Sequence, residues 1–176
     1  MIMRKYIIIL FLLCFMPLQA GAKEFKIGVV DVERILVQSA AGKSIEKQLN
    51  ARRESFQKEF SAREDNLMAS QKTLVERKND LSAEDFATQR KSFENQLLET
   101  RNLFKKRRSA LDKGLGKALG NLRKNLVQVT AEVADQKGLT VVLTRDSVVI
   151  VEKEMDITEV VLARLNAQVS QIDLGM

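Results

Sequence analysis

The apolar residues in the middle of the chain recur at spacings of four and seven, the pattern of a helix with one buried stripe. Neither Gly nor Pro occurs in residues 43–113, so no strong helix breaker interrupts this stretch. Arg63, Ser70 and Arg77 take core-facing positions in the first half, so we predict a sparsely apolar coiled coil. The stripe consists of two series, Leu49, Phe56, Phe60, Leu67, Leu74 and Leu81, and then Phe86, Phe93, Leu97, Phe104 and Leu111.

The break between the two series has the chemistry of a helix start. Ser82 can cap the first amides of a new helix, and Asp85 stands three residues later. We therefore predict an antiparallel helical hairpin over residues 44–124 with its tip near residues 80–83. The alternative is one uninterrupted helix. A helix from residue 44 to residue 81 would be about 57 Å long, so the hairpin has little core of its own and should project as an arm.

Both ends of the chain contain shorter, β-rich apolar runs. Residues 26–32 predict one strand, while 139–144 and 147–151 predict two more, joined as a hairpin at Arg145-Asp146. Gly138 is a natural stop for the helix before them, and Asp156 can open a last helix. The inward faces expected for these two helices are Leu122, Leu126, Val129 and Val133, and Val161, Leu165 and Val169.

Neither end is large enough to fold alone, so we expect the two ends to meet. The predicted fold class is α+β: a small β-rich body of residues 23–43 and 125–176, with the arm, residues 44–124, inserted between them. The strands do not alternate apolar with polar residues, which implies burial on both faces, yet one subunit offers little to cover them. We therefore predict self-association through an oligomer core of Ile27, Val29, Val142, Leu143, Val149 and Ile150.

Residues 1–22 have the order of a cleaved secretory signal. Arg4 and Lys5 precede an apolar run at residues 6–16, and Ala20-Gly21-Ala22 supplies the small residues of a cleavage site. The run is too short to span a bilayer, and the Leu before Cys14 disfavours lipid attachment. Cleavage removes the only Cys and the only Pro, so an exported protein without disulfides is expected, in the bacterial periplasm or outside the cell.

The charge of the chain is concentrated in one segment. Residues 101–124 contain nine basic residues and a single acid, Asp112, which gives this segment a charge of +8. Residues 23–176 as a whole carry +4, so the remainder is acidic. A charged run on a coiled coil is commonly a solvated face, but such a one-sided field also suits capture of an acidic partner. Phenylalanines accompany it, and they either fill the seam of the hairpin or hold a partner.

Several classes of catalytic site are excluded or poorly supported. The chain has no His, which excludes a His-based general base and an imidazole metal site. Gly42-Lys43-Ser44 lacks the first Gly of a phosphate-binding loop, because position 37 is Val37. The glycines at 114, 116 and 120 follow a helix instead of a strand, so they fit a softened helix or a close helix contact better than a dinucleotide loop. We expect no enzyme activity, no metal and no cofactor.

The residues at both ends resemble one family. KIGVVDVERIL at residues 26–36, the Gly42-Lys43 bend, and GLTVVLT and DITEVVLARLN near the C-terminus are similar to the Skp (OmpH) family of periplasmic chaperones. The resemblance implies a homotrimer of β-rich bodies whose helical hairpins surround a cavity. It implies that the protein binds unfolded outer-membrane proteins without ATP and prevents their aggregation.

On this interpretation the arm carries the client-binding residues. The expected basic set is Arg101, Lys105, Lys106, Arg107, Arg108, Lys113 and Lys117, and the expected apolar set is Phe86, Phe93 and Phe104. An anionic membrane lipid is a further candidate partner. Two alternatives are a coiled-coil structural or adaptor protein of the cell envelope and a basic nucleic-acid-binding protein. Export and the scarcity of aromatic residues argue against nucleic acid as a partner in the cell.

Overall fold

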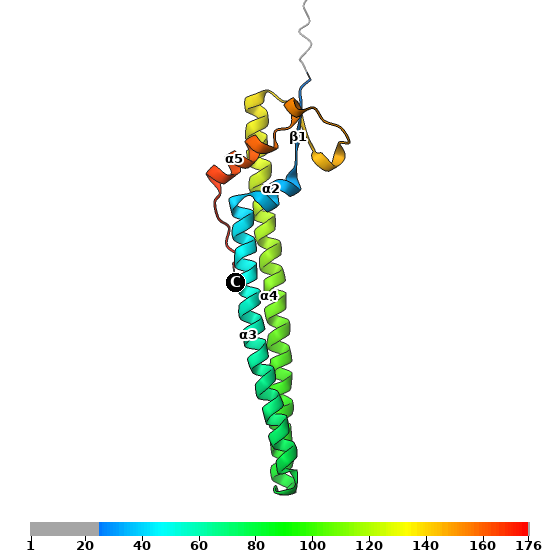
Figure 1. The fold of residues 1–176 in the computed structure, drawn as a ribbon, viewed down its shortest axis with the longest axis vertical. Coiled ribbons are helices and arrows are strands. Elements are labelled where there is room, and N and C mark those ends of the chain that lie inside the picture. The colour runs from blue at the N-terminus through cyan, green and yellow to red at the C-terminus, as the bar shows by residue number, and fades with distance from the viewer. Residues whose placement is uncertain (1–24, 176) are drawn as a thin grey trace, which may run out of the picture.

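The protein is a long two-helix rod with a small head at one end (Figure 1). The computed structural model describes residues 25–175; the predicted signal peptide, residues 1–22, lies outside them. In chain order the helices and strands are β1 (Ile27–Val30), α2 (Val32–Gln38), α3 (Ala40–Glu76), α4 (Ala83–Lys137), β2 (Val141–Thr144) and α5 (Thr158–Gln168). Residues 25–175 also contain three single 3₁₀ turns: η1 (Arg77–Asn79), η2 (Arg145–Ser147) and η3 (Lys153–Met155).

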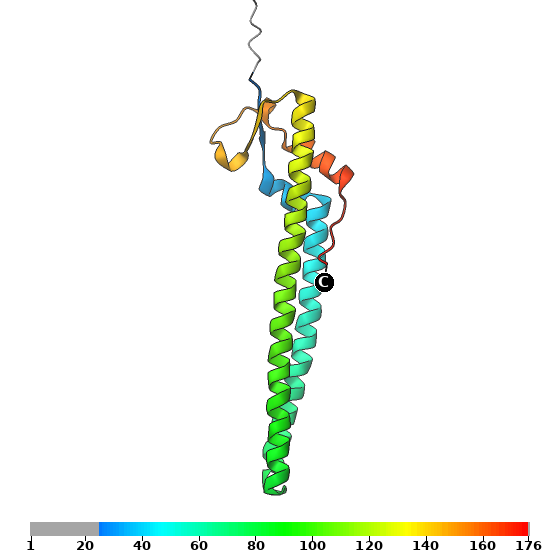
Figure 2. The ribbon, with the colours of Figure 1, turned by 180° about the vertical axis from the view of Figure 1, so that it is seen from behind.

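Helices α3 and α4 form the predicted antiparallel hairpin, which excludes one uninterrupted helix (Figures 1 and 2). At its tip the Ser82 hydroxyl accepts a hydrogen bond from the Asp85 N–H at 3.1 Å, as the sequence predicted. The two helices extend beyond the predicted arm, residues 44–124. Helix α3 begins at Ala40, and α4 continues unbroken to Lys137, so one helix belongs to both the arm and the head.

The sheet has two strands and not the three that the sequence predicted. Strands β1 and β2 pair in parallel, with Ile27 opposite Val141 and Val30 opposite Thr144. The predicted hairpin at Arg145-Asp146 is wrong, because the chain turns there as η2 and forms no strand at residues 147–151. The second edge of β1 is occupied by the segment at residue 156, whose neighbour Ile157 donates to the Val29 carbonyl at 2.9 Å. The head is therefore mainly helical instead of β-rich.

The core lies in the head, where α2, the start of α3, the end of α4 and α5 meet. The predicted inner face of α4 is buried, as are Val161 and Leu165 of α5, while Val169 is half-buried. Gly138 ends α4 with φ of 63°, as predicted. The cap of α5 is shifted by one residue: Ile157 takes the N-cap position, and the Asp156 carboxylate accepts from the Thr158 N–H at 2.9 Å.

The junction between α2 and α3 is a sharp bend at Ser39, whose hydroxyl accepts a hydrogen bond from the Gly42 N–H at 3.1 Å. The sequence placed this bend at Gly42, which instead lies inside the first turn of α3. A Cβ atom on Gly42 would lie only 1.9 Å from the Leu36 carbonyl oxygen. Gly42 therefore allows the end of α2 to approach the backbone of α3. The glycines at 116 and 120 have no such role, because a Cβ on either would meet nothing within 4 Å.

The C-terminal residues return along α3 at the base of the arm (Figure 1). The Gln48 side chain donates to the Ile172 carbonyl at 2.8 Å and accepts from the Leu174 N–H at 3.3 Å. The Leu174 side chain is 3% exposed and belongs to the main core. The tail thus stabilises the place where the arm leaves the head.

Candidate functional site

The seam between α3 and α4 is incompletely filled along the arm. In residues 50–113 only Thr100 and Leu111 are buried, whereas the head has a continuous core. The predicted polar positions are the cause, because Arg63 and Arg77 are exposed where a well-packed coiled coil would place apolar side chains. An arm packed in this way leaves apolar surface that water can reach.

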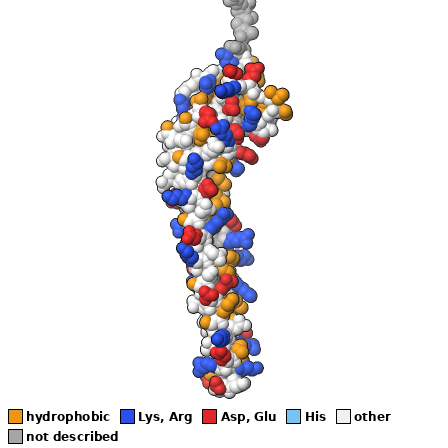
Figure 3. Space-filling view, in the orientation of Figure 1, with side chains coloured by type: hydrophobic (Ala, Val, Ile, Leu, Met, Phe, Trp, Pro, Cys, Tyr) orange, Lys and Arg blue, Asp and Glu red, His pale blue; other side chains and the backbone are white. Residues whose placement is uncertain are grey.

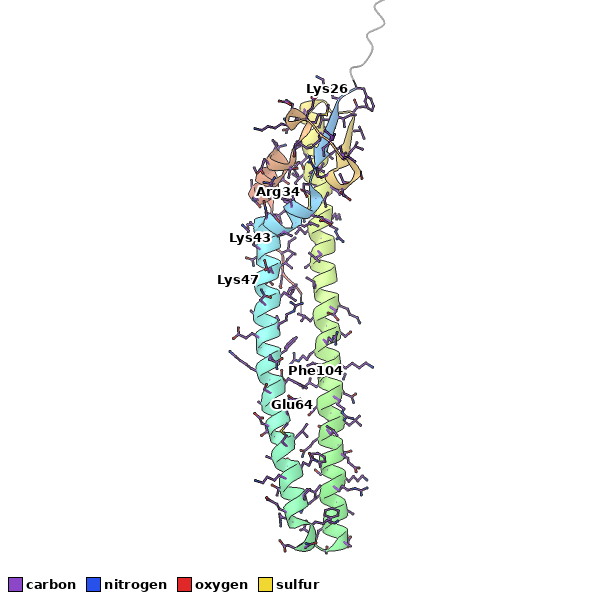
Figure 4. The ribbon with its side chains drawn as sticks, turned by 45° about the vertical axis from the view of Figure 1, so that its right-hand side comes forward. Lys26, Arg34, Lys43, Lys47, Glu64 and Phe104 are labelled. Atoms are coloured by element: carbon purple, nitrogen blue, oxygen red, sulfur yellow. The ribbon has the colours of Figure 1, made fainter. Side chains whose placement is uncertain are left out.

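One apolar opening is a groove near the middle of the arm, with a volume of about 330 Å³. Its centre is a pair of rings, Phe60 from α3 and Phe104 from α4, whose centroids are 4.4 Å apart and whose planes meet at 38°. Phe104 is 42% exposed, and it lies between the two helices (Figure 4). We call this opening the phenylalanine groove; it is lined by Arg53, Phe56, Gln57, Glu59, Phe60, Arg63, Thr100, Leu103, Phe104, Arg107, Arg108 and Leu111.

The rim of the phenylalanine groove is positively charged. Glu59 is the single acid in the lining, and its carboxylate lies 3.4 Å from the Arg63 guanidinium and 3.8 Å from that of Arg107. The Arg107 guanidinium also lies over the Phe56 ring, 5.6 Å from its centroid. Arg53 and Arg108 form no ion pair with any residue in the range 25–175. Four arginines and one glutamate therefore surround an apolar floor.

The predicted basic residues are all exposed, but the structure divides them between surfaces. Arg107 and Arg108 line the phenylalanine groove. Lys105, Lys106 and Lys113 instead line a shallow hollow on α4 together with Asn102, Ser109 and Ala110. Arg101 and Lys117 lie in neither opening. Figure 3 shows Lys and Arg side chains distributed along the arm, with several on one edge of its middle part.

The predicted apolar residues are also separated. Phe104 lies in the phenylalanine groove, whereas Phe93 lines a separate, more polar hollow nearer the tip with Leu74 and Gln89. Phe86 is half-buried in the first turn of α4 and lines neither opening. The three phenylalanines therefore do not form one continuous surface.

Comparison with known proteins shows which family this chain belongs to. A family model described as outer membrane protein (OmpH-like) matches residues 26–165. The chain belongs to the OmpH-like family. Its fold is similar to a crystal structure from Caulobacter crescentus CB15, described as an outer membrane chaperone (OmpH-like), with a TM-score of 0.79 and 20% sequence identity. The match covers 84% of this chain and 88% of that chain. No curated protein sequence matches.

The family assignment confirms the resemblance that the terminal motifs indicated. The tail that contacts Gln48 lies beyond the residues matched by the family model. Within residues 25–175 no group of three or more metal-ligating side chains gathers. No helix of that range is both long and apolar enough to cross a membrane.

The residues proposed for the oligomer core of this OmpH-like chain occupy different environments in one copy. Val29 is buried, while Ile27 and Val142 are half-buried. Leu143 is 37% exposed, and Val149 and Ile150 are 96% and 86% exposed. The last two therefore do not cover the strands of their own chain, contrary to the predicted hairpin.

The expected client-binding sets did not include four residues of α3 that line the groove: Arg53, Phe56, Phe60 and Arg63. These residues lie opposite the basic segment only because the hairpin folds back on itself. A usable signal was present, because residue 82, at the tip, is midway between Phe60 and Phe104 in number. Reflecting each α4 position about residue 82 gives its partner region on α3, and this would have joined the two halves of the groove.

Proposed function

We propose that this OmpH-like chain is an ATP-independent holdase chaperone of the periplasm, which binds unfolded outer-membrane proteins in a cavity between the arms of a homotrimer. The similar Caulobacter crescentus structure is described as an outer membrane chaperone (OmpH-like), and this supports a chaperone role here. The proposal includes cleavage of the signal peptide at residues 1–22. It also keeps the division into a body, residues 23–43 and 125–176, and an arm, residues 44–124.

The observation that carries the proposal is the open seam of the arm. A chaperone without nucleotide must bind exposed apolar chain loosely, which requires apolar surface accessible to solvent and not consumed by its own core. The phenylalanine groove supplies such a surface on a projecting helical pair. A coiled-coil spacer needs a regularly packed seam, and this arm has only two buried residues between positions 50 and 113.

The basic and apolar residues have different roles in this proposal. The seven basic residues of α4, from Arg101 to Lys117, attract acidic clients over a distance, because long-range fields raise association rates. Phe104, with Phe86 and Phe93 nearer the tip, retains the captured chain through apolar contact. An anionic lipid is a second kind of molecule that the basic set suits.

The trimer is proposed from the exposed apolar residues of the head. Val149 and Ile150 lie in a run of apolar residues that pairs with no strand of residues 25–175, and β2 has an edge that no described strand covers. Unpaired strand edges and exposed apolar patches favour association with another copy. Sedimentation of residues 23–176 is expected to give three times the monomer mass.

The test is suppression of aggregation without nucleotide. An outer-membrane barrel protein unfolded in urea is diluted into buffer with residues 23–176, and light scattering is followed. The wild-type chain is expected to abolish most of the scattering at about one trimer per client. Scattering equal to that with an inert protein would disprove the proposed function.

A charge variant tests the division of roles. Changing Lys105, Lys106, Arg107 and Arg108 to Gln should slow association in stopped-flow measurements and flatten its salt dependence, with a smaller effect on release. The matched control changes Arg52, Lys72, Lys78 and Lys91 to Gln, which removes four charges outside the basic set. Raising the salt to about 1 M shortens the Debye length to about 3 Å and should abolish the difference between wild type and variant. If the wild type and the quadruple Gln variant associate with the client at equal rates at low salt, the basic residues form only a solvated face of the helix.

A further inference from the structure

The phenylalanine groove combines two properties that the client-binding role alone does not require: a ring-lined floor and two arginines, Arg53 and Arg108, that form no ion pair within residues 25–175. We propose that it is a specific site for an aromatic side chain flanked by acidic residues on an extended segment of the bound client. The inference rests on the proposed function, because it takes an unfolded polypeptide as the partner. It adds a sequence preference to what would otherwise be unselective binding.

The floor of the groove favours an aromatic ring. Phe104 is 42% exposed and Phe60 is half-buried, so part of this ring pair is accessible to a third ring, and aromatic rings also pack in tilted arrangements. Arg107 already lies over the Phe56 ring, which shows that guanidinium–ring contacts form at this place. The volume of about 330 Å³ is at the small end of the range for ligand sites, so it suits one large side chain with parts of its neighbours.

The rim favours carboxylates beside that ring. Glu59 is engaged by Arg63 and Arg107, which leaves Arg53 and Arg108, one from each helix, without an ion pair in residues 25–175. A guanidinium binds a carboxylate through two parallel hydrogen bonds, which a lysine cannot do. Acidic residues on either side of a bound ring would therefore complete the charge balance of the rim.

A second copy of the chain fits the groove less well than an acidic segment. The groove is bordered by the segment 101–124, which carries +8, so two arms placed against each other here would bring like charges together. Charge complementarity selects a negatively charged partner, and the ring-lined floor selects an aromatic one.

The test measures binding of short labelled peptides to residues 23–176 by fluorescence anisotropy at physiological salt. The probe has one Phe flanked by two Asp on each side within a Gly-Ser context. One control peptide replaces every Asp with Asn, and another replaces Phe with Ala. We expect each control to bind about tenfold or more weakly than the probe, because each removes one of the two recognised groups.

Matched protein variants locate the site. The double variant Arg53→Gln and Arg108→Gln should weaken binding of the acidic probe about tenfold and leave the Asn peptide unchanged. The control variant Arg52→Gln and Lys91→Gln removes the same charge from exposed positions of α3 and α4 that do not line the groove, and it should change binding less than about twofold. Circular dichroism shows whether both variants keep their helices.

The possible outcomes separate this inference from the proposed function. Equal binding of all three peptides, or equal effects of the two double variants, would overturn the aromatic–acidic site. The site would also be overturned if the protein bound anionic phosphatidylglycerol vesicles but not the probe peptide. The same holds if probe binding were lost when copies of the chain associate. If aggregation of an unfolded barrel is still suppressed in those cases, the holdase function stands without the specific site. Absence of suppression by the wild-type chain would instead disprove the proposed function.

Discussion

Substitution of Gly42 by Ala should destabilise the protein, although the same change usually strengthens a helix. Ala is favoured over Gly by about 1 kcal/mol in a helix interior, so propensity alone predicts a more stable protein. At Gly42 the added Cβ would lie 1.9 Å from the Leu36 carbonyl oxygen and 3.0 Å from its carbon. Because carbon–oxygen contacts settle near 3.3–3.6 Å, the end of α2 would have to move by about 1.4 Å.

The surroundings of Gly42 make that movement costly. Ile35 and Ala41 are fully buried on either side of the bend, and Ile45 is 2% exposed one turn later. Overpacking of a close-packed core costs about 1–3 kcal/mol and more when backbone must move. After subtracting the gain in helix propensity, we expect a net loss of about 2 kcal/mol, which lowers the urea midpoint by about 1 M for a slope near 2 kcal/mol/M.

The assay is urea unfolding of residues 23–176 followed by circular dichroism, with every variant at one protein concentration because association contributes to stability. Gly116→Ala and Gly120→Ala are the matched controls, since a Cβ at either position meets nothing within 4 Å. Each should raise stability by about 0.5–1 kcal/mol. If Gly42→Ala is as stable as the wild type, or rises with the controls, the close approach of α2 and α3 is not as described.

Two further perturbations test the head. Leu174→Ala should lower the free energy of unfolding by about 2–3 kcal/mol, because the Leu174 side chain is 3% exposed in the main core. Asp173→Ala is the control and should leave stability nearly unchanged. Equal urea midpoints for the two variants would show that the tail does not dock. The pKa of Asp156 is lowered, chiefly by hydrogen bonding from the Thr158 side chain. The ionised Asp156 carboxylate therefore stabilises the fold fully above the unfolded-state pKa near 3.9. This stabilisation is lost as the pH falls through the lowered folded-state pKa. Asp156→Asn should therefore remove part of the loss of stability that acid causes between about pH 5 and pH 2, so that the urea midpoint of the variant depends less on pH. Asp112→Asn is the surface control. Parallel curves of urea midpoint against pH for wild type and Asp156→Asn would contradict this prediction.

The sequence by itself determined those features whose cause is local. The Ser82 cap and the Gly138 stop depend on hydrogen bonds or dihedral angles within a few residues, and both are where the pattern placed them. The buried face of α4 in the head follows from helical period alone. These features together predicted the hairpin and its tip, and the terminal motifs indicated the family to which the chain belongs.

Only the tertiary structure decided which distant segments pair. The apolar run containing Val149 and Ile150 has strong β propensity. Both edges of β1 are occupied, by β2 on one side and by the segment at residue 156 on the other, so this run finds no strand partner among residues 25–175. Gly42 is required by the Leu36 carbonyl, which belongs to another helix. The phenylalanine groove likewise exists because the fold at the tip sets Phe60 beside Phe104. Pairing of this kind depends on the space left by other elements, and no window of local sequence contains that information.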